Sequence, residues 1–232
     1  MNGIINLIGK RNKAQKTLNL SDIIFIVNYI CALYNITLSH IRPMSDLLGD
    51  NADKSHFMVY EAHDNILYIN YAKIKEYDSY SFNNYRIIFT IVHELRHCSQ
   101  FNYCLTKDDS VAYLYLICFD TLSQNNIISR IFYSKNHDYF PTEINADIVG
   151  ILFVLYVTKA LGDEIFYEIY LTELEIRIKK ALSKRAYDVL ISLYGANEFK
   201  NLQENMDEYG QFSNGILKEE EKCNNIKQMI LS

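Results

Sequence analysis

The chain has 232 residues, of which 49% are hydrophobic and 22% are charged, and its formal net charge is −5. This composition is ample for a sizeable hydrophobic core in one domain. The acidic balance provides no basic surface for phosphates, which argues against nucleic acid as the main partner.

The first part of the chain predicts a helix, a connector and a β-hairpin. Residues 22–38 are largely apolar and predict an opening helix, whereas residues 41–55 contain a proline and a glycine and are typical of a connector. Residues 57–63 and 66–71 alternate in polarity on either side of an Asp-Asn pair. This pattern predicts two strands joined by a tight turn.

The run His93-Glu94-Leu95-Arg96-His97 carries the most explicit chemistry of the chain. The surrounding segment has no glycine or proline and its apolar residues fall at helical spacing, which predicts a helix from about residue 82. On a helix His93 and His97 lie on one face, so both imidazoles can bind one metal ion. Glu94 points roughly 100° round from His93 and can hold a metal-bound water. This is the HExxH arrangement of zinc peptidases.

The second half of the chain predicts a series of helices. We expect a helix at 110–123, a less regular stretch at 124–140, and a long helix that begins at Pro141 and ends before Gly162. Asp163 can cap a further helix to about Leu182, and one more is expected to end at Gly195. The remaining residues are polar.

The long helix after Pro141 carries the candidate for a third metal ligand. Glu143, Ala146, Asp147 and Gly150 form one stripe of two carboxylates and two small residues. The small residues allow another helix to approach closely. Carboxylates in so apolar a helix are costly unless they are paired or bind a metal. The alternative for Glu143 is stabilisation by the positive end of the helix dipole.

HExxH followed by Glu143-x-x-x-Asp147 on a second helix resembles the gluzincin zinc metallopeptidases, most of all the intracellular minigluzincin and ImmA/IrrE-like members. The resemblance covers residues 20–162 and implies an α+β, mainly helical, zincin-like core with a small sheet before the HExxH helix. It implies one Zn²⁺ per chain held by His93, His97 and Glu143, with Glu94 as catalytic base. Asp147 would accept a hydrogen bond from a ligating histidine. In such folds the strand edge beside the metal binds an extended peptide.

A peptidase of this kind also needs a donor for the oxyanion of the tetrahedral intermediate. Tyr133, His137 and Tyr139 precede the Glu143 helix and are the candidates. The sequence does not choose among these three.

We therefore expect one metallopeptidase domain at 1–200, with its core at 20–162, a helical extension at 163–195 and a polar tail at 201–232. Its substrate would be an intracellular protein or peptide. The five cysteines form no Cys-x-x-Cys pair, no signal peptide is recognised, and the apolar runs are too short to span a bilayer. These features favour a cytoplasmic location, and we expect no membrane partner.

Two alternatives remain. A metallopeptidase-like fold without turnover would serve as a binding or regulatory module, but such a module has no need of Glu94 as a base. A helical interaction protein would carry the motif by coincidence and bind no metal tightly. In each case the helices after Gly162 could mediate assembly with a second copy or another partner.

Overall fold

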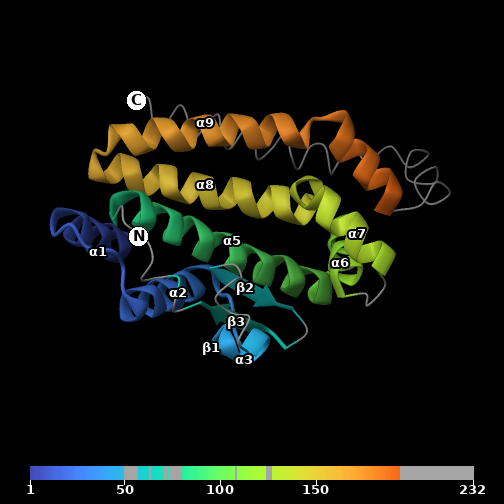
Figure 1. Ribbon diagram of the computed structural model, residues 1–232, viewed down its shortest axis with the longest axis horizontal. Coiled ribbons are helices and arrows are strands. Elements are labelled where there is room, and N and C mark those ends of the chain that lie inside the picture. Colours follow the sequence, from blue (N-terminus) through green and yellow to red (C-terminus); the bar gives the residue numbers. More distant parts are fainter. Residues whose placement is uncertain are drawn as a thin grey trace.

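The computed structural model describes residues 1–49, 57–62, 64–70, 73, 80–107, 109–123 and 127–193. Over these residues the protein is mainly helical with a small three-stranded sheet, which confirms the α+β expectation. Three long helices form the body and lie side by side in the order α5 (Tyr80–Thr106), α8 (Pro141–Leu161) and α9 (Glu164–Ala181) (Figure 1). The HExxH run lies in the middle of α5.

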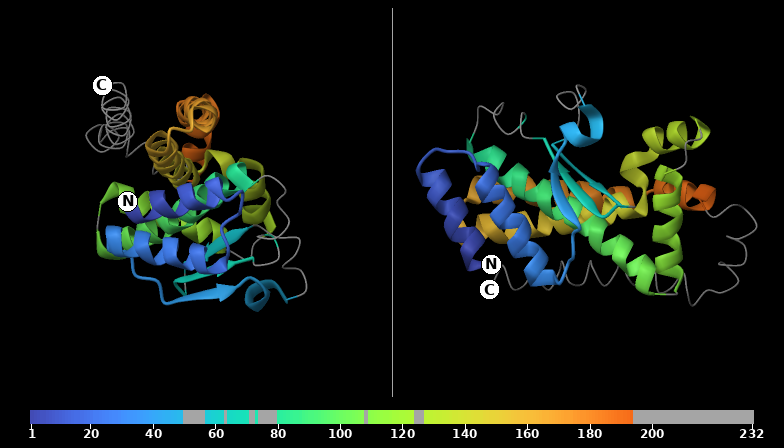
Figure 2. Two further views of the ribbon diagram at one scale, coloured as in Figure 1. Left: turned by 90° about the vertical axis from the view of Figure 1, so that its left-hand side faces the viewer. Right: turned by 90° about the horizontal axis from the view of Figure 1, so that it is seen from below.

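The sheet lies on the side of α5 that faces away from α9 (Figures 1 and 2). Its central strand β3 (Ile66–Ile69) pairs antiparallel with β2 (Met58–Glu61) and parallel with β1 (His40–Pro43). The predicted hairpin is confirmed, although its end residues at 63 and 71 lie outside the described residues. The prediction of a connector at 41–55 was wrong for β1, whose pairing partner β3 is the second strand of the hairpin.

Shorter helices surround this frame. They are α1 (Asn2–Lys13), α2 (Leu20–Tyr34), α3 (Ser45–Leu48), α6 (Ser110–Ser123), α7 (Ile127–Asn136) and the 3₁₀ helix η2 (His137–Tyr139). The opening helix starts before residue 22 because Asn19 caps it. The less regular stretch expected at 124–140 instead contains α7 and η2. A further helix covers 184–193, while Gly195 and the tail 201–232 lie outside the described residues.

Helix α8 begins and ends as its sequence predicts. Pro141 occupies its first turn, and Gly162 ends it in the left-handed conformation with a φ of 68°. Asp163 precedes α9 as expected, but its side chain makes no capping hydrogen bond. Its carboxylate instead accepts a hydrogen bond of 2.8 Å from the Tyr85 hydroxyl, so it joins the turn between α8 and α9 to α5.

Helices α5 and α8 approach each other closely at Gly150. A Cβ atom on Gly150 would lie 2.9 Å from the Phe89 ring and 3.1 Å from the Phe89 backbone oxygen. Around this point Ile88 and Ile91 of α5 and Val154 of α8 are fully buried. The small residues of α8 therefore do what their spacing predicted, and they bring its carboxylates against the face of α5 that carries His93.

One helical stretch, Ile131–Leu161, is long and apolar enough to cross a membrane by length and composition. The separate apolar runs of the sequence did not indicate this. Half of its most apolar window is buried inside the protein, and the core helices of soluble proteins pass the same test. Because this stretch includes α8, which packs between α5 and α9, we interpret it as a core element.

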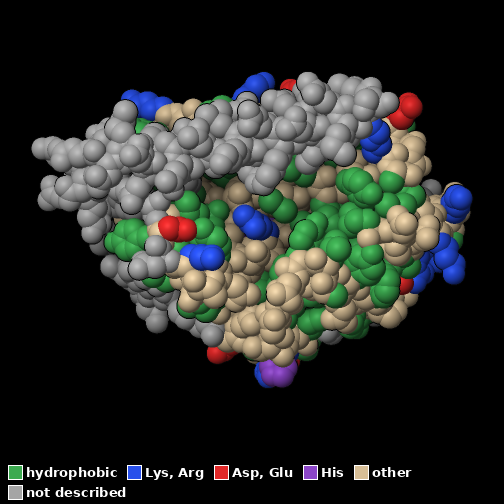
Figure 3. Space-filling view, turned by 180° about the vertical axis from the view of Figure 1, so that it is seen from behind, with side chains coloured by type: hydrophobic (Ala, Val, Ile, Leu, Met, Phe, Trp, Pro, Cys, Tyr) green, Lys and Arg blue, Asp and Glu red, His purple; other side chains and the backbone are tan. Residues whose placement is uncertain are grey.

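Apolar side chains are also exposed on the surface. They form a broad area on the back of the molecule, on the side of α1 and α2 (Figure 3). Phe25, Leu33 and Tyr34 of α2 are 45%, 48% and 57% exposed, and Ile165 of α9 is 74% exposed. The expected partner contact through the C-terminal helices stays a prediction.

Candidate metal centre

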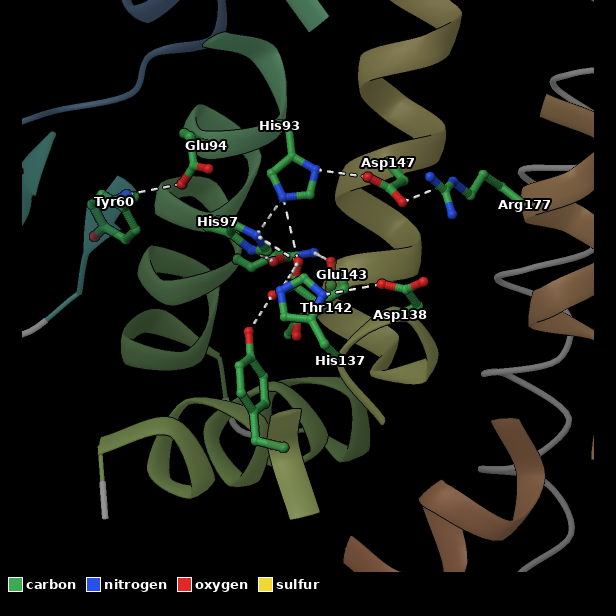
Figure 4. Close-up of polar contacts among 12 residues, drawn as sticks. Tyr60, His93, Glu94, His97, His137, Asp138, Thr142, Glu143, Asp147 and Arg177 are labelled. Atoms are coloured by element: carbon green, nitrogen blue, oxygen red, sulfur yellow. Dashed lines mark hydrogen bonds and ion pairs between the residues drawn. The ribbon is translucent and has the colours of Figure 1, made fainter. Parts of the chain in front are cut away.

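Two helices bring three potential metal-binding atoms together in the interior. Nε2 of His93 lies 3.0 Å from Nε2 of His97, and both atoms lie close to Oε2 of Glu143, at 3.4 and 3.5 Å (Figure 4). The side chains are 13%, 11% and 7% exposed. The pair on α5 and the carboxylate on α8 thus meet in a largely buried cluster.

These separations fit the coordination shell of zinc. Bonds of about 2.0–2.1 Å at tetrahedral angles place neighbouring ligand atoms about 3.3 Å apart. The three observed separations lie between 3.0 and 3.5 Å. Two imidazoles and one carboxylate are also the ligand set of several catalytic zinc sites, in which a fourth position is left for water or substrate. In both donor set and spacing, the residues fit the metal that the sequence predicts.

The outer nitrogens of both histidines face acceptors. Nδ1 of His93 lies 3.0 Å from Oδ1 of Asp147, at ion-pairing distance, and Nδ1 of His97 lies 3.0 Å from Oε1 of Gln100. These neighbours favour a proton on each Nδ1, which leaves the lone pairs of the neutral rings on Nε2. Two lone pairs and a carboxylate oxygen then point at one another, an arrangement that a cation stabilises.

Electrostatics within the pocket agree with this description. Burial lowers the pKa of His93, but Asp147 and Glu143 outweigh burial and raise it to about 10. Burial raises the pKa of Glu143, yet the neighbouring imidazoles His97 and His93 hold it well below its usual range. The pocket therefore favours positive charge between its carboxylates, which either protons or a metal ion can supply.

Gln100 holds His97 in place, a structural role whose contact with His97 the sequence analysis did not assign. It is 1% exposed, and its amide nitrogen donates to the backbone oxygen of Thr142 and to Oδ1 of Asn145, at 3.0 and 3.1 Å. The same Asn145 oxygen accepts a hydrogen bond of 2.7 Å from Arg96. Gln100 lies one turn after His97, and that spacing is the signal that could have identified it.

The side chain of Glu94 extends from α5 to the sheet. Its Oε2 accepts a hydrogen bond of 2.8 Å from the backbone N–H of Tyr60 (Figure 4). Strand β2 is an edge strand of the described sheet, and the carbonyl of Phe57 points to β3 through its bond to Asn70. By the alternation of a strand, the Tyr60 N–H points to the open edge. Glu94 therefore lies between the metal-binding pocket and a strand edge.

The structure distinguishes the three candidate oxyanion donors. His137 faces the pocket, with Nε2 3.5 Å from Oε2 of Glu143, and remains 45% exposed. Tyr133 donates a hydrogen bond of 3.1 Å to Oε1 of Glu143 and so acts on the third metal-binding residue. Tyr139 lies beneath the cations of Lys180 and Arg185, and no polar contact of its hydroxyl with the pocket is observed. His137 is therefore the candidate with access to a substrate.

No known family model, curated protein or solved structure matches the chain. The arrangement itself combines three potential metal-binding atoms, an adjacent carboxylate and an exposed imidazole. These groups can bind a divalent cation, accept a proton and donate a hydrogen bond. They are the components of metal-assisted hydrolysis.

Proposed function

We propose that the protein is a zinc-dependent metallopeptidase of the gluzincin type that hydrolyses peptide bonds in an intracellular protein or peptide. The convergence of His93 Nε2, His97 Nε2 and Glu143 Oε2 at separations of 3.0–3.5 Å carries the proposal. A zincin-like core is supported by the small sheet beside the HExxH helix and by the packing of that helix on the Glu143 helix.

Each residue has a defined role in this proposal. His93, His97 and Glu143 would hold one zinc ion, which would act as a Lewis acid that activates water and polarises a carbonyl group. Glu94 accepts the proton of the attacking water and passes it to the amine that leaves. His137 donates a hydrogen bond to the carbonyl oxygen as negative charge develops on it. Asp147 and Gln100 orient the two imidazoles.

The substrate is proposed to be an extended segment that lies along the open edge of β2. An added strand uses backbone hydrogen bonds, so it requires free backbone groups on that edge. The Tyr60 N–H lies on that edge, where it donates a hydrogen bond to Glu94. Substrate binding would therefore take this N–H and release the Glu94 carboxylate for proton transfer. The proposal places the reaction in the cytoplasm, with neither nucleic acid nor membrane as partner.

Metal content and hydrolysis, measured on three proteins, test the proposal. Wild type, Glu143→Ala and Glu94→Gln are purified in parallel, analysed for zinc, and incubated with a library of unstructured peptides that is read by mass spectrometry. We expect about one zinc per chain in wild type, loss of zinc in Glu143→Ala, and zinc without cleavage in Glu94→Gln. Cleavage by Glu94→Gln at the wild-type rate would overturn the mechanism.

A binding module without turnover is the second candidate, and the contact between Glu94 and Tyr60 favours it. A carboxylate held by a backbone N–H at 2.8 Å is already used structurally. Such a module would bind zinc and cleave no peptide in the library. Absence of zinc from reconstituted wild type would overturn both candidates and favour a helical interaction protein with a coincidental motif.

A further inference from the structure

A single carboxylate links α9 to the metal-binding pocket. Oδ1 of Asp147 lies 3.0 Å from Nδ1 of His93, and Oδ2 of the same group lies 2.9 Å from Nε of Arg177. The three side chains come from α8, α5 and α9 in turn (Figure 4). Each oxygen of the carboxylate thus has its own ion-pairing neighbour, although the His93 Nδ1 and Arg177 Nε atoms are buried and neither makes a hydrogen bond within the described residues.

This link lies largely within the protein. The side chains of Asp147 and Arg177 are 16% and 24% exposed, and the Arg177 Nε atom itself is buried. After the turn at Gly162, helix α9 packs along α8. Tyr170 and Leu174 of α9 are buried, and they lie two turns and one turn before Arg177. The guanidinium is therefore held by a packed helix, which makes it a firm anchor for the Asp147 carboxylate.

We infer that Arg177 is a positioning residue for the metal site: it fixes the plane of the Asp147 carboxylate and thereby the ring of His93. The inference rests on the proposed zinc site, and it makes α9 part of the metal-binding machinery. A carboxylate with only one contact can rotate about its side-chain bonds. With Arg177 on Oδ2, rotation away from His93 breaks two contacts at once, so the metal-binding orientation of the ring is favoured.

Lys180 provides a matched comparison on the same face of α9. Its Nζ lies 2.6 Å from Oδ2 of Asp138, and Oδ1 of Asp138 lies 3.3 Å from Nδ1 of His137. This second link also runs from α9 through a carboxylate to a histidine. It differs in that Asp138 is 57% exposed and that His137, whose Nε2 lies 3.5 Å from Oε2 of Glu143, is not one of the three grouped residues. Loss of Lys180 removes an ion pair from α9 without acting on His93.

The experiment is a double-mutant cycle that is read by zinc affinity. Zinc dissociation constants are measured with a competing chromophoric chelator for wild type, Arg177→Gln, Asp147→Asn, the double variant and Lys180→Gln. Outer contacts of ligating histidines change metal affinity by about 10–100-fold. We expect Arg177→Gln to weaken zinc binding about tenfold, no further weakening when it is added to Asp147→Asn, and wild-type affinity in Lys180→Gln. The visible spectrum of the cobalt-substituted protein should change in Arg177→Gln and not in Lys180→Gln.

Each outcome decides the inference. Wild-type affinity in Arg177→Gln overturns it, as does an equal weakening in Lys180→Gln or full additivity with Asp147→Asn. If Arg177→Gln does not fold, Arg177→Met keeps the packed stem without the charge and is measured in the same cycle. Failure of wild type to bind zinc would instead overturn the proposed function and the inference together, so the two failures are distinguishable.

Discussion

The backbone N–H of Tyr60 on β2 donates a hydrogen bond of 2.8 Å to Oε2 of Glu94 on α5. This contact joins the sheet to the helix that carries both histidines. It also gives Glu94 a structural role in addition to its proposed catalytic one, because the carboxylate satisfies a backbone group on the strand edge. The two roles can be separated by choice of substitution.

Replacement of Glu94 by glutamine or by leucine should separate stability from catalysis. Glutamine keeps an acceptor for the Tyr60 N–H, so the free energy of unfolding of the metal-free protein should stay near that of wild type. Leucine leaves the partly buried N–H without a partner and should lower that free energy by about 1–3 kcal/mol. Urea unfolding followed by circular dichroism measures both values. Equal stability of the two variants would show that the contact contributes nothing.

Gln100→Leu should weaken zinc binding and also destabilise the protein. The variant removes the acceptor of His97 Nδ1 and the side-chain donor to the Thr142 carbonyl. We expect about 10–100-fold weaker zinc binding and a stability loss of about 1–3 kcal/mol. Asn84→Leu is the control, since Asn84 is an equally buried amide that bonds to Asn12 and Leu18 away from the pocket. It should lose stability with zinc affinity unchanged, and a similar loss of affinity there would exclude a specific role for Gln100.

Gly150→Ala should destabilise the protein by forcing α5 and α8 apart. The new methyl group would lie 2.9 Å from the half-buried Phe89 ring and 3.1 Å from the Phe89 backbone oxygen, and the helix backbone cannot move cheaply. Overpacking of this kind costs about 1–3 kcal/mol. Gly3→Ala is the control, because its nearest contact would be an ordinary 3.5 Å and alanine favours the helix. Thermal unfolding should show a lower midpoint for the first variant and an equal or higher one for the second.

The sequence predicted those parts of the fold that depend on local signals. Pro141 and Gly162 mark α8 because each restricts or permits the backbone conformation at its own position. Strand β1 was missed because its parallel pairing with β3 is non-local and leaves no periodic signal in four residues. Helix α7 was missed because the serine and asparagine residues in this part of the chain are typical of loops.

The candidate site was predictable to a similar degree. His93, Glu94 and His97 form one continuous motif, and Glu143 with Asp147 repeats the same one-turn spacing, so the residues that the structure brings together are visible in the chain. The role of Arg177 could not be predicted from the sequence, because its contact with Asp147 depends on how α9 packs against α8. For the same reason, the sequence could not choose among residues Tyr133, His137 and Tyr139, whose directions are set by α7 and η2.

Tyr133→Phe should weaken zinc binding while Tyr139→Phe should not. The Tyr133 hydroxyl donates to Oε1 of the buried Glu143 carboxylate, and this bond orients the third ligand. Hydrogen bonds to charged groups contribute about 1.5–3 kcal/mol, so we expect a dissociation constant for zinc that is higher by about 10–100-fold. Tyr139 lies on the outer side of η2 against Lys180 and Arg185, and its phenylalanine variant keeps the ring that contacts them. Chelator competition on both variants measures the difference, and equal affinities would show that Tyr133 does not support the metal.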